Sequence, residues 1–140
     1  MNEDQAKAAF TAALASYNPG FGTFFLARFL ELGISYGTEN CIVDMPVSDW
    51  MFNPQGTLHG GIINTVLDIS MGHLLHHTVG AGATLQMNTQ YLGAVRGGIV
   101  QAVATFTRKG RSICFLEARL ADSAGKPVAL ATSTWRVNDA

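Results

Sequence analysis

The stretch NPQGTLHGGIINTVLDISMGHLLHHT (residues 53–78) decides the fold. From about His59 to Thr78 its apolar residues recur at helical spacing and make a wide face, and a Gly-Ala-Gly run (80–82) ends the pattern. A helix that is apolar almost all round has to be buried on most sides. We therefore predict one long central helix around which the rest of the chain is wrapped.

The segments on either side of this helix predict a sheet and an N-terminal helical region. Downstream, β-favouring residues are separated by tight-turn sequences such as Gly97-Gly98 and Lys109-Gly110, which is typical of antiparallel strands. Upstream, two helical patterns precede a β-favouring run that Pro46 ends. The expected elements are helices over 2–16 and 21–32, a strand over 34–47, and a four-strand meander over 84–95, 99–108, 111–121 and 126–137. This order predicts an α+β fold.

Length and composition are those of a single folded domain. The 140 residues fit one domain, 1–140, in which 1–32 form an N-terminal helical segment. Hydrophobic residues make up 48% of the chain and charged residues 14%, which excludes an intrinsically disordered protein. Nine Lys and Arg against ten Asp and Glu give a net charge of −1, which argues against general nucleic-acid binding.

The N-terminal residues and the cysteines lead us to expect a cytoplasmic protein. The chain starts with an acidic segment, unlike a signal or transit peptide, and no apolar run approaches the roughly 18 residues of a membrane span. Cys41 and Cys114 lie in no CxxC or zinc-ligand pattern, so we expect neither a disulfide framework nor a structural zinc site. No membrane or nucleic-acid partner is expected.

Two features of the central stretch can carry chemistry. His59-Gly60-Gly61 opens the predicted helix, where backbone N–H groups are unpaired and glycines let a ligand approach closely. With the positive end of the helix dipole, these groups stabilise a carbonyl oxygen that gains negative charge. Asp68 is a carboxylate on a helix otherwise built for burial, and such an acid is usually paired or functional. Either feature alone also fits a structural role, but together with Asn53 they are more specific.

The spacing of these two features predicts that two chains share each site. Gly60 and Asp68 are eight residues apart, which places them about 12 Å apart along one helix. One thioester or ester carbonyl cannot touch both groups of the same helix. If both serve one site, they come from two antiparallel copies of the helix, so we expect a homodimer.

The chain resembles the hotdog-fold acyl-CoA thioesterases, and among them the phenylacetate-degradation-type branch. The resemblance runs from about Ile34 to Val137, and its specific part is the spacing between His59-Gly60-Gly61 and Asp68, with Asn53 before them. It implies a hotdog fold, in which a curved antiparallel β-sheet wraps around one long central helix, with dimers usually paired into tetramers. It also implies that the chain hydrolyses an aryl or medium-chain acyl-CoA to a carboxylic acid and coenzyme A. We expect no metal and no cofactor besides the coenzyme A of the substrate.

The resemblance assigns a role to each residue of the motif. Asp68 is the general base that activates water, or the nucleophile that attacks the thioester. Gly60 donates its backbone N–H to the thioester oxygen, while Asn53 and His59 position and polarise that carbonyl. Thr84 orients the water or Asp68. Asp68 and Thr84 come from one chain, and the other three residues come from its partner.

Four cations and one glycine are candidates for binding the substrate. Arg108, Lys109 and Arg111 fall within four residues at a predicted hairpin, and Arg96 precedes a Gly-Gly turn. These cations predict an anion site for the coenzyme A phosphates, although a solvated turn explains them as well. Gly61 is the fifth candidate for a substrate-binding residue.

Some interpretations stay open at this level. His73 and His77 stand at i, i+4 but lack a third metal ligand at suitable spacing, so packing at the helix end is favoured. Asn64 and Thr65 lie about one turn before Asp68 and either tune its pKa or merely satisfy its hydrogen bonding. The rival functions are a hotdog hydratase or dehydratase and a non-catalytic acyl-CoA-binding protein.

Overall fold

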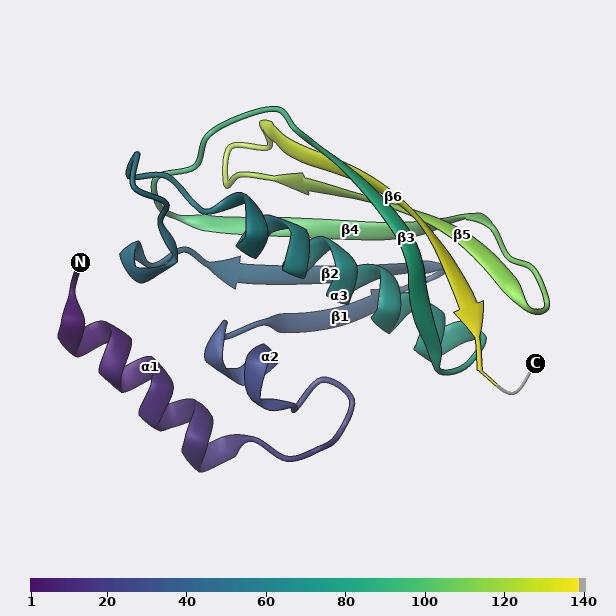
Figure 1. Cartoon of the computed structure of the whole chain (residues 1–140), viewed down its shortest axis with the longest axis horizontal. Coiled ribbons are helices and arrows are strands. Elements are labelled where there is room, and N and C mark those ends of the chain that lie inside the picture. Colours follow the sequence, from purple (N-terminus) through teal and green to yellow (C-terminus); the bar gives the residue numbers. More distant parts are fainter. Residues whose placement is uncertain (139–140) are drawn as a thin grey trace.

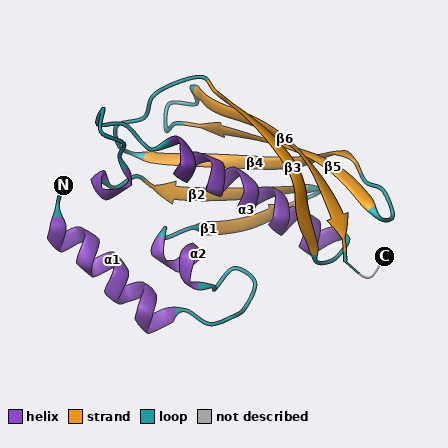
Figure 2. Ribbon diagram, viewed as in Figure 1, coloured by secondary structure: helices purple, strands orange, loops and turns teal. Residues whose placement is uncertain are grey.

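The structure is a computed structural model that describes residues 1–138. It contains one sheet, one long helix lying against it, and a pair of shorter helices at the N-terminal side (Figure 1, Figure 2). The elements in chain order are α1 (Glu3–Ser16), α2 (Phe25–Phe29), β1 (Gly33–Gly37), β2 (Asn40–Pro46), the short 3-10 helix η1 (Asp49–Met51), α3 (Gly60–Thr78), β3 (Gly82–Tyr91), β4 (Ile99–Arg108), β5 (Ile113–Ala121) and β6 (Pro127–Val137).

The sheet curves around α3, as the apolar pattern of this helix requires. All six strands are antiparallel, in the order β1-β2-β4-β5-β6-β3. The helix contacts the five strands β2 to β6, and Figure 1 shows it running across one face of the sheet while β3 and β6 curve over its far end. Its buried residues are Ile63, Val66, Leu67, Ser70, Met71, His73, Leu74 and Leu75. The predicted hotdog-type α+β fold is confirmed.

Close contact between α3 and β6 depends on Gly72. A Cβ on Gly72 would lie 2.9 Å from Cη2 of Trp135, so a larger residue would push the helix away from the strand. The Trp135 indole N–H donates to the Ser133 hydroxyl at 2.7 Å, and that hydroxyl donates to the sulfur of Met71 at 3.0 Å. This buried chain of polar contacts connects β6 to Met71 of α3 and satisfies the buried polar groups of Ser133 and Trp135.

The predicted four-strand meander is wrong in the position of β3. Strands β4, β5 and β6 do follow one another as a meander, but β3 pairs with β6 at the far edge and not with β4. Residues 92–98 carry the chain across to the other half of the sheet and end at Gly98, whose φ is 79°. A crossing connection and a hairpin turn use the same turn residues, so the local sequence did not distinguish them.

Two predicted elements at the N-terminal side also differ from the structure. The run 34–47 is a hairpin of β1 and β2, because Glu39 adopts a left-handed φ of 61° and the Asn40 side chain accepts the Gly37 N–H at 3.0 Å. β-favouring residues on both sides concealed this turn. The predicted helix 21–32 is reduced to α2, since Gly22 has a φ of 91° and the segment before Phe25 is a turn.

The N-terminal helix begins as predicted, with the Asn2 side chain accepting the Gln5 N–H at 3.0 Å. Helix α1 packs on α2 through Phe10 and Phe25, whose rings meet edge to face at 5.6 Å. Figure 1 shows this pair of helices on the β1 side of the molecule, with α2 next to β1. In the described range no helix is long and apolar enough to cross a membrane.

Candidate active site

Asp68 lies in the middle of α3, half-buried, and its carboxylate meets the neighbouring strand β3. The Thr84 hydroxyl donates to Asp68 Oδ1 at 2.8 Å. Burial raises the pKa of Asp68, and the hydrogen bond from Thr84 lowers it in part, with a net rise. The ionised carboxylate is therefore a stronger base than an ordinary surface aspartate, which suits proton abstraction from water.

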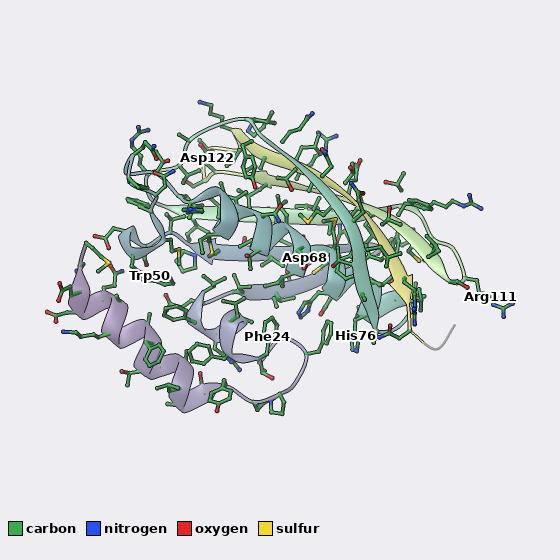
Figure 3. All side chains as sticks on the ribbon, in the orientation of Figure 1. Phe24, Trp50, Asp68, His76, Arg111 and Asp122 are labelled. Carbon is green, nitrogen blue, oxygen red and sulfur yellow. The ribbon has the colours of Figure 1, made fainter. Side chains whose placement is uncertain are left out.

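Two cavities meet at this carboxylate. They measure about 490 and 460 Å³, and both are lined by Phe24, Asp68, Ile69 and Thr84. Figure 3 shows Asp68 near the centre of the molecule and Phe24 below it, beside α2. The larger cavity continues between aromatic residues, Phe21 and Trp135, and the other continues toward Leu26 and Met87. A carboxylate at the mouth of mainly apolar cavities is placed to act on a polar group attached to an apolar one.

The start of α3 presents one unpaired backbone donor, the N–H of Gly60. His59 is the N-cap, and its Nδ1 accepts the Gly61 N–H at 2.8 Å, so the neutral ring carries its proton on Nε2. The Gly60 carbonyl accepts the Tyr91 hydroxyl at 3.1 Å. Within residues 1–138 the Gly60 N–H has no acceptor. The free donor at the positive end of the helix is therefore that of Gly60 and not that of Gly61.

Asn53 shapes the loop before α3. Its Oδ1 accepts the N–H groups of Gln55 at 3.0 Å and Thr57 at 3.2 Å, and its Nδ2 donates to the Thr57 hydroxyl at 2.9 Å. This loop lines a third cavity of about 390 Å³, which Asn53 shares with Gly60 and Tyr91. The structure thus brings Asn53 beside the start of the helix, as the motif predicts.

Comparison with known proteins identifies the family. The family model described as the thioesterase superfamily matches residues 55–129, which include Gly60, Asp68 and Thr84. This chain belongs to the thioesterase superfamily. Its relatives include PA1618 of Pseudomonas aeruginosa, a candidate esterase that is 31% identical over 112 residues, with 74% of each chain covered.

Solved structures of similar proteins agree with this assignment. BH2602 of Bacillus halodurans, solved with CoA, gives a TM-score of 0.89 over 99% of this chain and 94% of that chain, and at 22% identity this likeness shows the fold. The smu.793 protein of Streptococcus mutans, bound to acetyl CoA, is 27% identical, with a TM-score of 0.73 over 76% of this chain and 88% of that chain. The match is to the superfamily and does not separate the phenylacetate-degradation-type branch from the others.

In this thioesterase-superfamily chain the two halves of the predicted site do not meet within one subunit. Gly60 and Asn53 line one cavity, whereas Asp68 and Thr84 line the other two. The eight residues between Gly60 and Asp68 span about 12 Å of helix. A site shared between two copies stays a prediction, in which each subunit would contribute one half to each of two sites.

The four candidate cations are not grouped either. Lys109 pairs with Glu39 at 3.1 Å, and Arg108 and Arg111 lie at or beside the turn between β4 and β5. Figure 3 shows Arg111 far from Asp68. Arg96 precedes β4 while Arg108 ends it, which separates them by about 30 Å of strand. One chain therefore cannot hold a single diphosphate with Arg96 and the hairpin together.

Two side chains near Asp68 do not bind it. Thr65 donates to the Gly61 carbonyl at 2.9 Å, and Asn64 Oδ1 accepts a hydrogen bond from Thr89. Neither residue therefore tunes the carboxylate through a direct hydrogen bond. Tyr91 is a further residue of the site that the sequence does not reveal, because an aromatic residue in a strand gives no local sign that it contacts the start of a helix.

The histidines at the end of α3 are packed among aromatic rings. The Tyr36 hydroxyl lies 2.9 Å from His73 Nδ1, and His76 stacks on Phe21 with ring centroids 3.9 Å apart. Burial, with a smaller contribution from His76, lowers the pKa of His73 to about 4. His77 stacks on Tyr36. Among residues 1–138 there is no group of three or more His, Cys, Asp or Glu residues suited to a metal ion.

Proposed function

We propose that this chain is an acyl-CoA thioesterase that hydrolyses an aryl or medium-chain acyl-CoA to a carboxylic acid and coenzyme A. The observation that carries the proposal is the Asp68 carboxylate, held by Thr84 at 2.8 Å where two mainly apolar cavities meet. Membership of the thioesterase superfamily supports the reaction class. The similarity to proteins solved with CoA and acetyl CoA supports coenzyme A as part of the substrate.

The proposed mechanism uses Asp68 as the general base. Asp68 takes a proton from a water molecule as the water oxygen attacks the thioester carbon, and the carbonyl oxygen becomes negatively charged. The bond to sulfur then breaks, and the proton on Asp68 neutralises the leaving thiolate. Because a thiolate is a good leaving group, a base and an oxyanion donor suffice, worth about 10²–10⁴ and 10²–10³ in rate respectively. A direct nucleophilic attack by Asp68 is the alternative route.

The oxyanion donor is proposed to come from a second copy of the chain. The Gly60 N–H is free and lies at the positive end of α3, and His59 Nε2–H is a second donor beside it. We propose a homodimer in which Asp68 and Thr84 of one subunit face Asn53, His59 and Gly60 of the other. The same proposal has four further parts. The chain forms a dimer of dimers and belongs to the phenylacetate-degradation-type branch. Its cations bind the coenzyme A phosphates, and it is located in the cytoplasm.

A thiol-release panel tests the proposed function. The purified protein is incubated with phenylacetyl-CoA, benzoyl-CoA, octanoyl-CoA and acetyl-CoA, and a chromogenic disulfide reports free coenzyme A. We expect release with at least one of the first three and a loss of about 10²–10⁴ in kcat for Asp68→Asn. Asp44→Asn is the matched control, because Asp44 accepts a hydrogen bond from Gln101 on the β2–β4 face, which an amide oxygen can also accept.

Three outcomes would overturn the proposal or its mechanism. Water addition to an enoyl-CoA without thiol release would favour a hotdog hydratase. Binding of coenzyme A by both the wild type and Asp68→Asn, with turnover by neither, would favour a non-catalytic binding protein. Unchanged thiol release by Asp68→Asn would remove Asp68 from the mechanism.

A further inference from the structure

Three hydroxyl groups of β3 bind three residues of α3 that lie on one side of the helix. The α3 residues are spaced by four, which aligns them along a single stripe. We call the three contacts the hydroxyl ladder: Tyr91 donates to the Gly60 carbonyl at 3.1 Å, Thr89 donates to Asn64 Oδ1, and Thr84 donates to Asp68 Oδ1 at 2.8 Å. The outer two contacts end on the carbonyl of Gly60, whose N–H is the proposed oxyanion donor, and on the carboxylate of Asp68, the proposed base.

The Tyr91 contact orients the start of the helix. The peptide group between Gly60 and Gly61 is held at both ends, its carbonyl by Tyr91 and its N–H by His59 Nδ1. The Tyr91 ring also lies against Gly60, because a Cβ on this glycine would be 3.2 Å from Tyr91 Cε1. The preceding peptide, which carries the free Gly60 N–H, is fixed as well, since the His59 carbonyl accepts from residues 62 and 63.

The middle contact between Thr89 and Asn64 has no part in the proposed bond-making steps. Both side chains are half-buried, and their hydrogen bond lies between the two functional residues, four positions from each. A helix that slid by one turn would move 5.4 Å and lose all three contacts together. The ladder therefore specifies one register of α3 against β3. Apolar packing alone would not select that register, because an apolar helix packs similarly in any register.

We propose that Thr89 and Tyr91 are positioning residues, which hold the Gly60 N–H and the Asp68 carboxylate in the orientation and spacing that the reaction needs. The role in catalysis rests on the proposed function. The reaction of a thioester held between two groups is sensitive to displacements of about 1 Å, which can change a rate by up to about 10²-fold. Removing one hydroxyl of the ladder should thus lower kcat more than substrate affinity.

Kinetics of conservative variants test this proposal. Tyr91→Phe keeps the ring and removes the hydroxyl, and Thr89→Val keeps the shape and removes the hydroxyl. We expect kcat to fall about tenfold in each, with KM within about twofold of the wild type, and Thr89→Ser to restore kcat. Thr132→Val is the matched control, because Thr132 is exposed on the adjacent strand β6 opposite Asn88. Unchanged kcat in both variants, or failure of Thr89→Ser to restore it, would refute the positioning role.

A second measurement does not depend on activity. In ¹⁵N–¹H spectra, the backbone amides of residues 60–64 should shift in Tyr91→Phe and Thr89→Val and remain in place in Thr132→Val. If the wild type hydrolyses no acyl-CoA but these shifts occur, the proposed function fails while the ladder stands as the device that sets the helix register. If the amides do not move in either variant, the ladder does not position the helix, whatever the activity.

Discussion

Subunit complementation is the sharpest test of a site shared by two chains. Asp68→Asn removes the base but keeps an oxygen that can accept the Thr84 hydrogen bond. Gly60→Pro removes the oxyanion donor. Gly60 is the first residue of α3, a position that tolerates proline, and His59 before it has φ −63° and ψ 134°, the extended conformation favoured before proline. Gly60→Ala, which keeps the N–H and adds a Cβ 3.2 Å from Tyr91, controls for crowding.

The expected magnitudes follow from the arrangement of the residues. Asp68→Asn alone should lose about 10²–10⁴ in rate, and Gly60→Pro alone about 10²–10³. If the two variants are co-expressed equally and pair at random, about half of the dimers contain one chain of each kind. In such a dimer one site has both native residues and the other has neither. The mixture should therefore recover about a quarter of the wild-type activity, and the purified heterodimer about a half.

The assay is thiol release by heterodimers isolated with two different affinity tags. Both parent variants and Gly60→Ala are measured at the same protein concentration, and melting temperatures confirm that each is folded. Recovery of activity in the heterodimer requires that Asp68 and Gly60 of different chains act together. A heterodimer no more active than its parents would refute the shared site, and Gly60→Ala as inactive as Gly60→Pro would show that crowding, and not the N–H, explains the loss.

Three further predictions concern pH and thiol reactivity. The Thr84 hydrogen bond lowers the pKa of Asp68, so Thr84→Val should move the acid limb of the rate–pH profile to higher pH. Thr84→Ser keeps the hydroxyl and should leave the limb in place. An acid limb that does not move in Thr84→Val would contradict this prediction. Burial raises the folded-state pKa of Asp68, so ionisation costs stability as pH rises through that pKa. Asp68→Asn should thus melt at a higher temperature than the wild type at neutral pH. This gain in melting temperature should vanish below pH 3.8, the ordinary pKa of an aspartate. A lower melting temperature of Asp68→Asn at neutral pH would contradict the prediction. Burial raises the pKa of Cys41 to about 12, and Cys114 is also buried, so a chromogenic disulfide should label neither thiol in the native protein and both after unfolding. Labelling of the native protein would show that it opens locally.

The sequence predicted the parts of the site that are local to α3. The apolar period predicted a helix from about His59 to Thr78, opened by the HGG motif, and the structure has α3 at Gly60–Thr78 with His59 as its N-cap. The placement of Thr84 near Asp68 came from the family resemblance, and the structure puts the two side chains in contact. These features depend on residues close in the chain or on a motif with fixed spacing, which is why they could be read without coordinates.

The rest of the site depends on how distant segments pack. Tyr91 and Thr89 meet α3 because β3 lies at the edge of the sheet beside β6, whereas the turn residues of the sequence predict that strand next to β4. A strand's neighbours are set by the whole sheet, and a shift of one residue turns every side chain to the other face. Phe24 lines the Asp68 cavities because α1 and α2 pack beside the core, and the local sequence does not predict this packing.

The placement of β3 reconciles two requirements that conflict within α3. The helix must be apolar enough to be covered by the sheet, and it must also carry an ionisable base beside cavities for an apolar group. Burying a carboxylate without partners costs several kcal/mol, a large fraction of the roughly 5–15 kcal/mol by which a whole domain is stable. Here Asp68 is only half-buried, and the Thr84 hydroxyl supports its charged form. By placing Thr84 and Tyr91 on one strand, the fold supports the base and the start of the helix together, so a displacement of β3 would affect both halves of the proposed site at once.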